Sequence, residues 1–281
     1  FRPMNVIGFG GVGCRIAGWF EDYPQYNVYY IDHQKWGKNS LTFKKQKHPE
    51  KYEESARDFK DFVEALDDEP IYLFLCGASY TTAASLAFRQ ALGDKEVNLV
   101  YVQPDTSILN ATRQKHERVV YHVLQEYTRS GLFERMYLFV NNTIEAILGD
   151  LHVIGYWDQI NTVIASSIHM INVYNNNTPI VGGLEDPQET CRISTVGNKD
   201  IETGEEKLFF PLDLVRESCY IYAVSEERLK QSNNLLMQVR EELKTRLAKD
   251  HSLSFGIFPT SYDRDFAYVI KHTSFTQQRQ E

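Results

Sequence analysis

Apolar and polar positions alternate in blocks through the first half of the chain. Short, nearly unbroken apolar stretches are separated by segments whose apolar residues recur at helical spacing. The apolar stretches cover residues 4–8, 26–32, 71–76, 97–102 and 135–140, and the helical segments include residues 14–22, 52–66 and 110–130. Continuously apolar strands are typical of a parallel sheet buried on both faces. The pattern therefore predicts an α/β fold with a doubly wound, mostly parallel sheet.

The pattern changes in the second half. A short helix is predicted over residues 143–148, and a longer, more apolar helix over 157–174. Short strands are then predicted at 219–224, 255–258 and 266–273, around one charged helix at 226–249. The acidic, hairpin-like stretch 198–207 is interpreted as a surface excursion. We expect a sheet domain over residues 1–156, a central connecting helix over 157–175, and a smaller C-terminal α+β domain over 176–281.

Composition narrows the function classes. With 42% hydrophobic residues the chain can bury a full core, and its 38 acidic against 30 basic side chains give a formal charge of −8. A net negative charge disfavours nonspecific electrostatic binding to nucleic acid phosphates, so no direct nucleic acid partner is expected. No apolar run approaches the roughly 20 residues of a membrane helix. The four cysteines are scattered without a paired motif and no signal peptide is visible, so a cytoplasmic location without membrane contact is predicted.

A glycine-rich turn joins the first predicted strand to the first helix. In Gly8-x-Gly10-x-x-Gly13 the missing side chains allow backbone N–H groups to approach a phosphate at the positive end of a helix. Gly11 lies inside this turn and Cys14 opens the helix behind it. These five residues are candidate nucleotide ligands, and the alternative is a tight turn that packs helix on strand.

Asp32 ends the second strand about 20 residues further on, where a dinucleotide-binding fold places the acid that contacts a ribose. An NAD-dependent oxidoreductase is therefore one alternative. A second turn, residues 77–85, is also small and rich in hydroxyls, and two such loops suit a nucleoside triphosphate. The second half offers no catalytic constellation for hydride transfer, because its histidines are isolated.

The order of these motifs resembles the tubulin/FtsZ superfamily of polymerising GTPases over most of the chain. Residues 6–13 resemble the first phosphate loop of that family, and residues 76–85 are similar to its signature G-G-G-T-G-T-G-A-A-P. In this resemblance Gly77, Ala78, Ser79 and Thr81 meet the phosphates of GTP or GDP, and Mg²⁺ arrives with the nucleotide. No G-K-[ST] follows either loop, so a Walker-type NTPase is disfavoured.

Three further residues occupy positions that contact the nucleoside in the family. Arg113 stands at the arginine of a loop similar to F-E-G-x-x-R, although Leu109 replaces its glutamate. Asn142 lies in a turn that resembles I-P-N-D, and Asn161 lies where the central helix presents an Asn or Asp to the base. An amide can pair with the guanine edge through its donor and its acceptor. A helix cap or a turn residue is the alternative for each asparagine.

The stretch 183–190 resembles the loop N-x-D-x-x-D that enters the nucleotide pocket of the next subunit in the family. Asp186 and Glu189 occupy its two acid positions, and the resemblance implies that they polarise the water attacking the γ-phosphate. The alternative is an exposed acidic turn. The implied function is a GTPase that polymerises head to tail with itself, with an adaptor or cargo protein as a further partner.

Departures from the family pattern define the second hypothesis. Tyr80 replaces a glycine of the signature, and its ring would hinder backbone approach to the phosphates. With Leu109, this supports a tubulin-like structural or regulatory protein that binds nucleotide weakly or not at all. The short, divergent sequence is most similar to the tubulin-like proteins of phages and plasmids.

Overall fold

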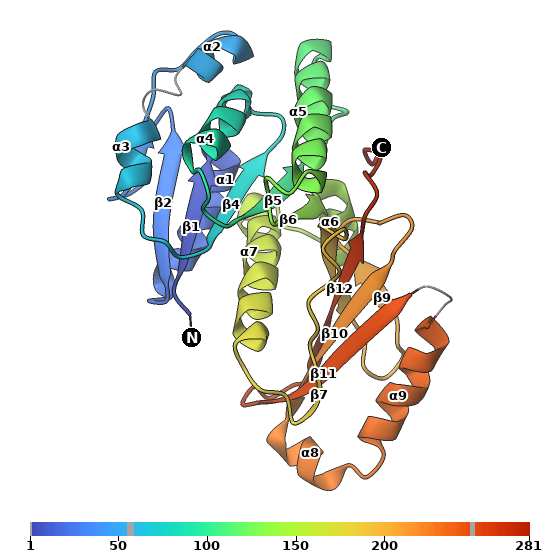
Figure 1. Ribbon diagram of the computed structural model, residues 1–281. Helices are drawn as coiled ribbons and strands as arrows, with labels where there is room; N and C mark the ends of the chain where they lie inside the picture. Colours follow the sequence, from blue (N-terminus) through green and yellow to red (C-terminus); the bar gives the residue numbers. More distant parts are fainter. Residues whose placement is uncertain (1, 55–58, 248–250) are drawn as a thin grey trace. The chain divides into compact units, whose positions relative to one another are not determined.

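The computed structural model describes residues 2–54, 59–247 and 251–281 (Figure 1). The chain forms two compact units, of which unit 1 comprises Phe1–Ser166 with Thr276–Glu281 and unit 2 comprises Ser167–Phe275. The division falls inside the long helix α7 (Tyr156–Asn175), and the segment Thr276–Glu281 belongs to unit 1.

The core of unit 1 is a parallel sheet in the order β3-β2-β1-β4-β5-β6, in which every pair of neighbours is parallel. Its strands are β1 (Met4–Phe9), β2 (Tyr26–Asp32), β3 (Ser40–Thr42), β4 (Ile71–Cys76), β5 (Val97–Gln103) and β6 (Arg135–Val140). The chain starts in the middle at β1, runs outward to β3, and returns to β4 on the other side. Ligands of open α/β sheets bind where the strand order reverses in this way, at the carboxyl ends of the strands.

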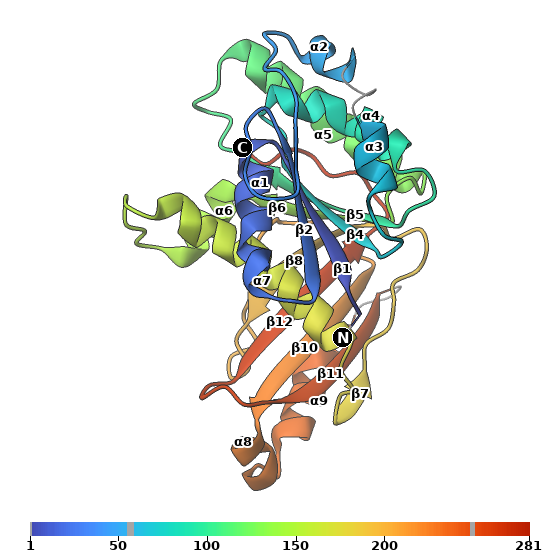
Figure 2. The same cartoon turned by 90° about the vertical axis from the view of Figure 1, so that its left-hand side faces the viewer.

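Helices cover both faces of this sheet. Figures 1 and 2 show α1 (Gly10–Gly18) on one face and α4 (Ser85–Ala91) with α5 (Ala111–Arg129) on the other. Aromatic rings pack between the sheet and the helices on both faces. The ring centroids of Phe9 and Phe88 are 5.7 Å apart on the α4 face, and those of Phe20 and Phe74 are 5.4 Å apart on the α1 face. The remaining helical segments are η1 (Trp19–Asp22), α2 (Pro49–Glu53), α3 (Phe59–Glu64), η3 (Tyr80–Ala84) and α6 (Asn141–Leu148). The predicted doubly wound α/β fold is confirmed.

Some boundaries in unit 1 differ from the prediction. The helix after the first glycine turn begins at Gly10 and not at Cys14, because Gly10 adopts a φ of +76° that turns the strand directly into the helix. The single helix predicted over 52–66 is represented by α2 and α3, and the middle of that prediction, 55–58, lies outside the described residues.

Unit 2 contains a mixed sheet in the order β8-β12-β10-β11-β7, and β9 pairs with β8. Its strands are β7 (Val181–Gly183), β8 (Ile193–Lys199), β9 (Glu206–Leu208), β10 (Glu217–Ser225), β11 (Ser252–Thr260) and β12 (Phe266–Thr273). Among the described strand pairs of unit 2, only β10 and β11 run parallel. The stretch 198–207, interpreted as a hairpin-like surface excursion, does form a hairpin, and Asn198 and Lys207 are exposed. The side chains of Lys199 and Glu206, however, are buried in it.

The charged helix predicted over 226–249 is two helices, α8 (Glu226–Gln231) and α9 (Leu235–Arg246). A polar break at 232–234 separates them, since short polar side chains compete for backbone hydrogen bonds inside a helix. One apolar stripe of α9 packs on the sheet through Leu235, Val239 and Leu243. Residues 248–250, at the end of the predicted helix, lie outside the described residues.

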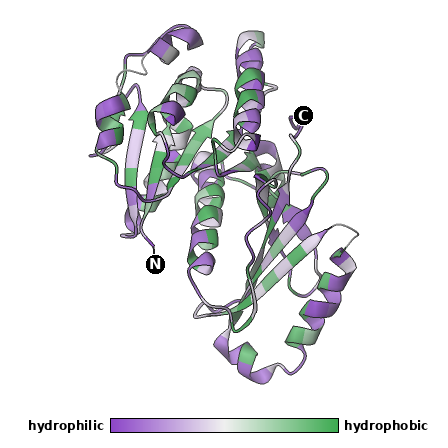
Figure 3. Ribbon diagram, in the orientation of Figure 1, coloured by the Kyte–Doolittle hydropathy of each residue, from purple (hydrophilic) through white to green (hydrophobic). Residues whose placement is uncertain are grey.

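The hydropathy colouring in Figure 3 shows green, apolar central strands in unit 1 and mixed colours on the helices. Within the described ranges, no helix has both the length and the apolar character needed to cross a membrane.

Candidate functional site

Two loops meet at the carboxyl ends of β1 and β4. A Cβ atom built on Gly10 would lie 2.7 Å from Oγ1 of Thr81 and 3.4 Å from Oγ of Ser79. The two hydroxyls are themselves 2.6 Å apart. The glycine turn and the hydroxyl-rich turn, which are about 70 residues apart in the sequence, therefore form one surface at the point where the strand order reverses.

A cavity of about 710 Å³ opens on this surface. Its wall includes Gly11, at which an added Cβ atom would meet nothing within 4 Å, so backbone is exposed to the cavity there. Four basic or imidazole side chains line it, and the described lining residues include no carboxylate. The lining residues are Gly11, Val12, His33, Lys45, Gln46, Lys47, Tyr52, Cys76, Ala78, Ser79, Tyr80, Thr81 and Arg113. Such a cavity suits a polyanion.

The basic part of the wall is held in place by Tyr52. Its hydroxyl accepts a hydrogen bond from the backbone N–H of Gln46 at 2.8 Å and donates one to the carbonyl of Gln46 at 3.2 Å. The phenol ring is buried against Phe43, with ring centroids 5.5 Å apart. Lys45 and Lys47 are the chain neighbours of Gln46, whose backbone Tyr52 holds in place. Sequence reasoning missed both lysines, and the available signal was the basic run immediately before α2.

Arg113 is brought to the same cavity from the start of α5. Its guanidinium lies 4.8 Å from the centre of the Tyr80 ring, and Nη1 donates to the carbonyl of Ala78 at 3.2 Å. Tyr80, which stands where the resembled signature has glycine, therefore lines the wall as one half of a cation–π pair.

Three of the predicted glycines serve packing. A Cβ atom on Gly8 would collide with the backbone of Cys14, one on Gly13 with the carbonyl of Phe74, and one on Gly77 with the hydroxyl of Tyr101. These glycines let α1 and the second loop approach the sheet closely. Close packing of helix on strand is therefore a sufficient reason for glycine at these three positions. Gly10, in contrast, faces the junction of the two loops, and Gly11 faces the cavity.

Cys14 lies behind the glycine turn. Its thiol is buried and donates to the carbonyl of Gly8 at 3.4 Å, and desolvation by burial raises its pKa well above the usual value. A thiol in this setting is inert as a nucleophile.

Asp32 points into protein and does not line the cavity. One carboxylate oxygen accepts from the indole N–H of Trp36 at 2.7 Å, and the other accepts from the backbone N–H of His33 at 2.8 Å. The side chain is 1% exposed. Both oxygens thus have internal partners, which weakens the argument for a dinucleotide ribose at this position.

The predicted nucleoside contacts Asn142 and Asn161 do not line the cavity. Asn142 is exposed on the first turn of α6, and Asn161 is buried within α7. The neighbour Asn141 is also buried, and its Oδ1 has no hydrogen-bond partner among the described residues. A buried amide oxygen without a partner is costly, so it marks Asn141 as a candidate residue in the turn from which the sequence analysis had chosen Asn142.

Asp186 and Glu189 lie in unit 2, on the loop between β7 and β8, and both are exposed. The loop is tethered on both sides of Asp186. The backbone N–H of Glu185 donates to Oγ of Ser254 at 3.3 Å, and that of Gln188 donates to a carboxylate oxygen of Glu217 at 2.8 Å. A fixed loop therefore presents two acids to solvent, where another molecule can meet them.

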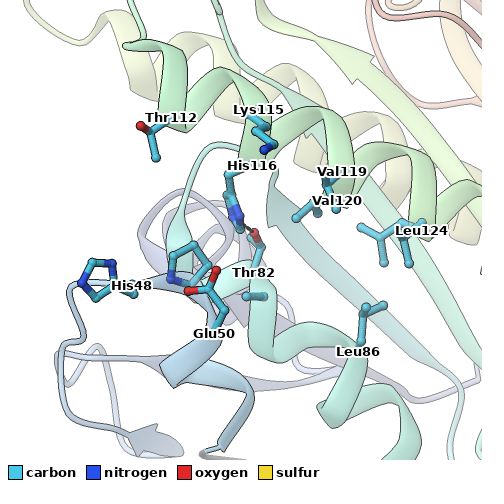
Figure 4. A pocket seen from close by; sticks show the side chains of 13 residues that line it. His48, Glu50, Thr82, Leu86, Thr112, Lys115, His116, Val119, Val120 and Leu124 are labelled. Atoms are coloured by element: carbon cyan, nitrogen blue, oxygen red, sulfur yellow. Dashed lines mark hydrogen bonds between the residues drawn. The ribbon is translucent and has the colours of Figure 1, made fainter.

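A second cavity of about 380 Å³ lies on the other side of η3, between α2, α4 and α5 (Figure 4). Its lining is mainly aliphatic and includes Leu86 and Val120. His116 projects from α5 toward Thr82, with Nε2 at 3.2 Å from the threonine hydroxyl and 2.9 Å from the carbonyl of Ser79. Burial is the main cause that lowers the pKa of His116. The loop that carries Ser79 and Thr82 is therefore contacted from the side opposite the first cavity.

Within the described part of the chain, no three His, Cys, Asp or Glu side chains form a cluster that could hold a metal ion.

The fold of this chain is the tubulin/FtsZ fold. The match to an empty FtsZ dimer from M. jannaschii covers 97% of this chain and 88% of that chain, with a TM-score of 0.72 and 11% identity. A GTPγS-form protofilament of TubZ from Bacillus thuringiensis serovar israelensis matches over 98% and 88%, with a TM-score of 0.73 and 13% identity. A helical model of a two-stranded TubZ-Bt filament matches over 98% and 85%, with a TM-score of 0.71 and 13% identity. No family model and no curated protein matches the sequence.

Proposed function

We propose that this protein binds GTP in the cavity between its two loops and assembles head to tail into a polymer, with hydrolysis completed at the subunit contact. The observation that carries the proposal is the junction of Gly10 with Ser79 and Thr81, beside a cavity whose walls hold Lys45 and Lys47. The location at the reversal of the strand order and the tubulin/FtsZ fold support it.

The residues present fit a polyphosphate. Exposed backbone at Gly11 and the hydroxyls of Ser79 and Thr81 can donate hydrogen bonds to phosphate oxygens. Lys45 and Lys47 can offset the charge of the terminal phosphate. We propose that Mg²⁺ arrives with the nucleotide, because the described cavity wall offers no carboxylate to coordinate it.

The nucleoside is assigned to the other predicted residues. Arg113 lies at the cavity wall and can contact the sugar or the base. Asn142 and Asn161, which lie outside the described cavity wall, are proposed for the base, together with Asn141, whose buried Oδ1 would have to become accessible to accept from a guanine N–H. An adenine edge presents a different order of donors and acceptors, so a preference for GTP over ATP is expected.

Two observations support the proposal of polymerisation: the exposed acids Asp186 and Glu189, and the solved structures that share this fold. Asp186 and Glu189 sit on a tethered, solvent-facing loop, and they would orient a water molecule in the pocket of the next subunit. A heterologous contact of this kind builds an open filament. The similar solved structures include protofilaments and a filament. The cytoplasm, which supplies GTP, is the compartment that this proposal implies.

The test is sedimentation and light scattering of the full chain with GTP, GDP, a non-hydrolysable GTP analogue, ATP or no nucleotide, with phosphate release followed in the same samples. Assembly that requires GTP and declines as phosphate accumulates is expected. The double variant K45A/K47A should lose affinity for GTP more than for GDP. The exposed variant K35A/K38A is the matched control, because it removes two lysines of the same region that do not line the cavity.

A second candidate function is a tubulin-like structural or regulatory protein without nucleotide turnover. The cation–π pair of Tyr80 and Arg113 favours it, because this pair occupies cavity wall that a nucleotide would need. Assembly that is indifferent to nucleotide would support this candidate. An increase in GTP affinity in Y80G would show that the ring restricts the pocket.

A further inference from the structure

The segment Thr276–Glu281 is tied to unit 1 by two glutamine side chains. Gln125 accepts from the backbone N–H of Gln277 at 2.6 Å and donates to its carbonyl at 3.1 Å. The side chain of Gln103 makes the same pair of hydrogen bonds with Gln280. It accepts from the backbone N–H at 3.2 Å and donates to the carbonyl at 2.6 Å. Each amide therefore satisfies both backbone groups of one residue, as a neighbouring strand would. The two attachment points bracket Arg279.

Arg279 reaches a carboxylate that has no access to solvent. Its Nε contacts Oε2 of Glu117, on α5, and the Glu117 side chain is 0% exposed. The second carboxylate oxygen of Glu117 accepts from the hydroxyl of Tyr101 at 2.7 Å. Burial is the largest influence on Glu117 and raises its pKa, while Tyr101 and Arg279 act in the opposite direction. A buried carboxylate of this kind needs its partners to remain charged.

Tyr101 and Glu117 form the floor beneath the second phosphate loop. A Cβ atom on Gly77 would collide with the Tyr101 hydroxyl and would lie 3.0 Å from Cγ of Glu117. Gly77 is the first residue of the turn that continues to Ser79 and Thr81. The position of this loop is therefore set by two side chains whose own geometry depends on the contact with Arg279.

We infer that Arg279 is a positioning residue for the phosphate loop: it holds Glu117 and Tyr101 in place under Gly77 and balances a negative charge below the loop. Removing this guanidinium leaves Glu117 charged without its cation, which repels an anion above it, or protonated or rearranged, which changes its hydrogen bond with Tyr101 and loosens the loop. The effect on nucleotide binding rests on the proposed function, whereas the effect on loop order does not.

The test compares R279M, the conservative variant R279K and the double variant E117Q/R279M in the full chain. Hydrogen–deuterium exchange of the peptide covering 76–84 is measured without nucleotide, and the affinity for a fluorescent GTP analogue is measured separately. In R279M, exchange in this peptide is expected to rise about tenfold, and affinity to fall by about the same factor. In R279K and E117Q/R279M, both the exchange of this peptide and the affinity are expected to return most of the way to their wild-type values.

The exposed pair Glu126 and Arg129 on the same helix supplies the control, because these side chains lie 3.5 Å apart at the surface and E126Q/R129M should change neither readout. Unchanged exchange in R279M, or a loop that stays loose in E117Q/R279M, overturns the inference. If R279M does not fold, the double variant decides alone by the same criterion. Absence of GTP binding in the wild type refutes the proposed function but leaves the exchange measurement valid.

Discussion

Replacing Gly11 by alanine separates the contribution of this glycine to folding from its contribution to binding. Gly11 is the second residue of α1, its φ is not positive, and a Cβ atom there would meet no protein atom within 4 Å. Alanine is favoured over glycine in a helix by about 0.5–1 kcal/mol, so the free energy of unfolding should rise by that amount.

The same methyl group would project into space that the proposed phosphate needs. If it displaces one charge-assisted hydrogen bond from the backbone, binding loses about 1.5–3 kcal/mol, which corresponds to roughly a 10- to 150-fold rise in Kd. The substitution is thus expected to make the protein more stable and a weaker binder, a pair of signs that general damage does not produce.

Two other glycines of unit 1 calibrate the result. Gly93 has a φ of +60° and open space around it, so G93A should lose about 1 kcal/mol of stability through its backbone alone and bind normally. Gly10 combines a φ of +76° with the close approach of Thr81 Oγ1, so G10A should lose more stability than G93A as well as binding. Urea unfolding and titration of a fluorescent GTP analogue measure both quantities. GTP binding by G11A within about threefold of the wild type would refute the assignment of the cavity as a phosphate site.

Three further predictions address other parts of the molecule. D186A and E189A should each abolish most GTP turnover in phosphate-release assays while GTP affinity stays at the wild-type level, and turnover that survives both changes would make these acids a surface turn. The pKa of His116 is lowered mainly by burial, so the unfolded chain binds more protons below a pH of about 6.5; stability should fall between pH 7.5 and pH 5.5, and less so in H116Q, as urea titrations at both pH values can test. K199M removes the cation that lies 2.6 Å from Glu242 in unit 2 and should cost about 3 kcal/mol in urea unfolding, with partial recovery in K199M/E242Q; no loss would show that the ion pair is neutral for stability.

Much of the sheet in unit 1 could be predicted from the sequence, because most positions of its central strands are buried and apolar. The predicted bounds of β2, β4 and β6 coincide with those of the structure. Unit 2 was harder to predict. Lys199 and Glu206 look like surface residues in the sequence, and only their pairing across a hairpin makes their burial possible.

The candidate site could be located from the sequence but not resolved residue by residue. The glycine motif indicated the turn, yet only the space around each Cβ distinguishes Gly11, which faces the cavity, from Gly13, which packs against Phe74. The basic run before α2 shows the charge of Lys45 and Lys47, but it does not show that the chain brings them to the cavity. Arg279, which is more than 150 positions from Glu117, is beyond local sequence reasoning for the same reason.

The thin helical segment η3 separates two cavities, one lined by Ser79 and Thr81 and the other by Thr82 and Ala83. A wall shared in this way is subject to thermodynamic reciprocity. An occupant of the aliphatic cavity that strengthens or weakens the proposed phosphate binding must itself be bound more or less tightly, by the same factor, when phosphate is present. His116 contacts both Ser79 and Thr82, so this side chain would carry the coupling between the two cavities.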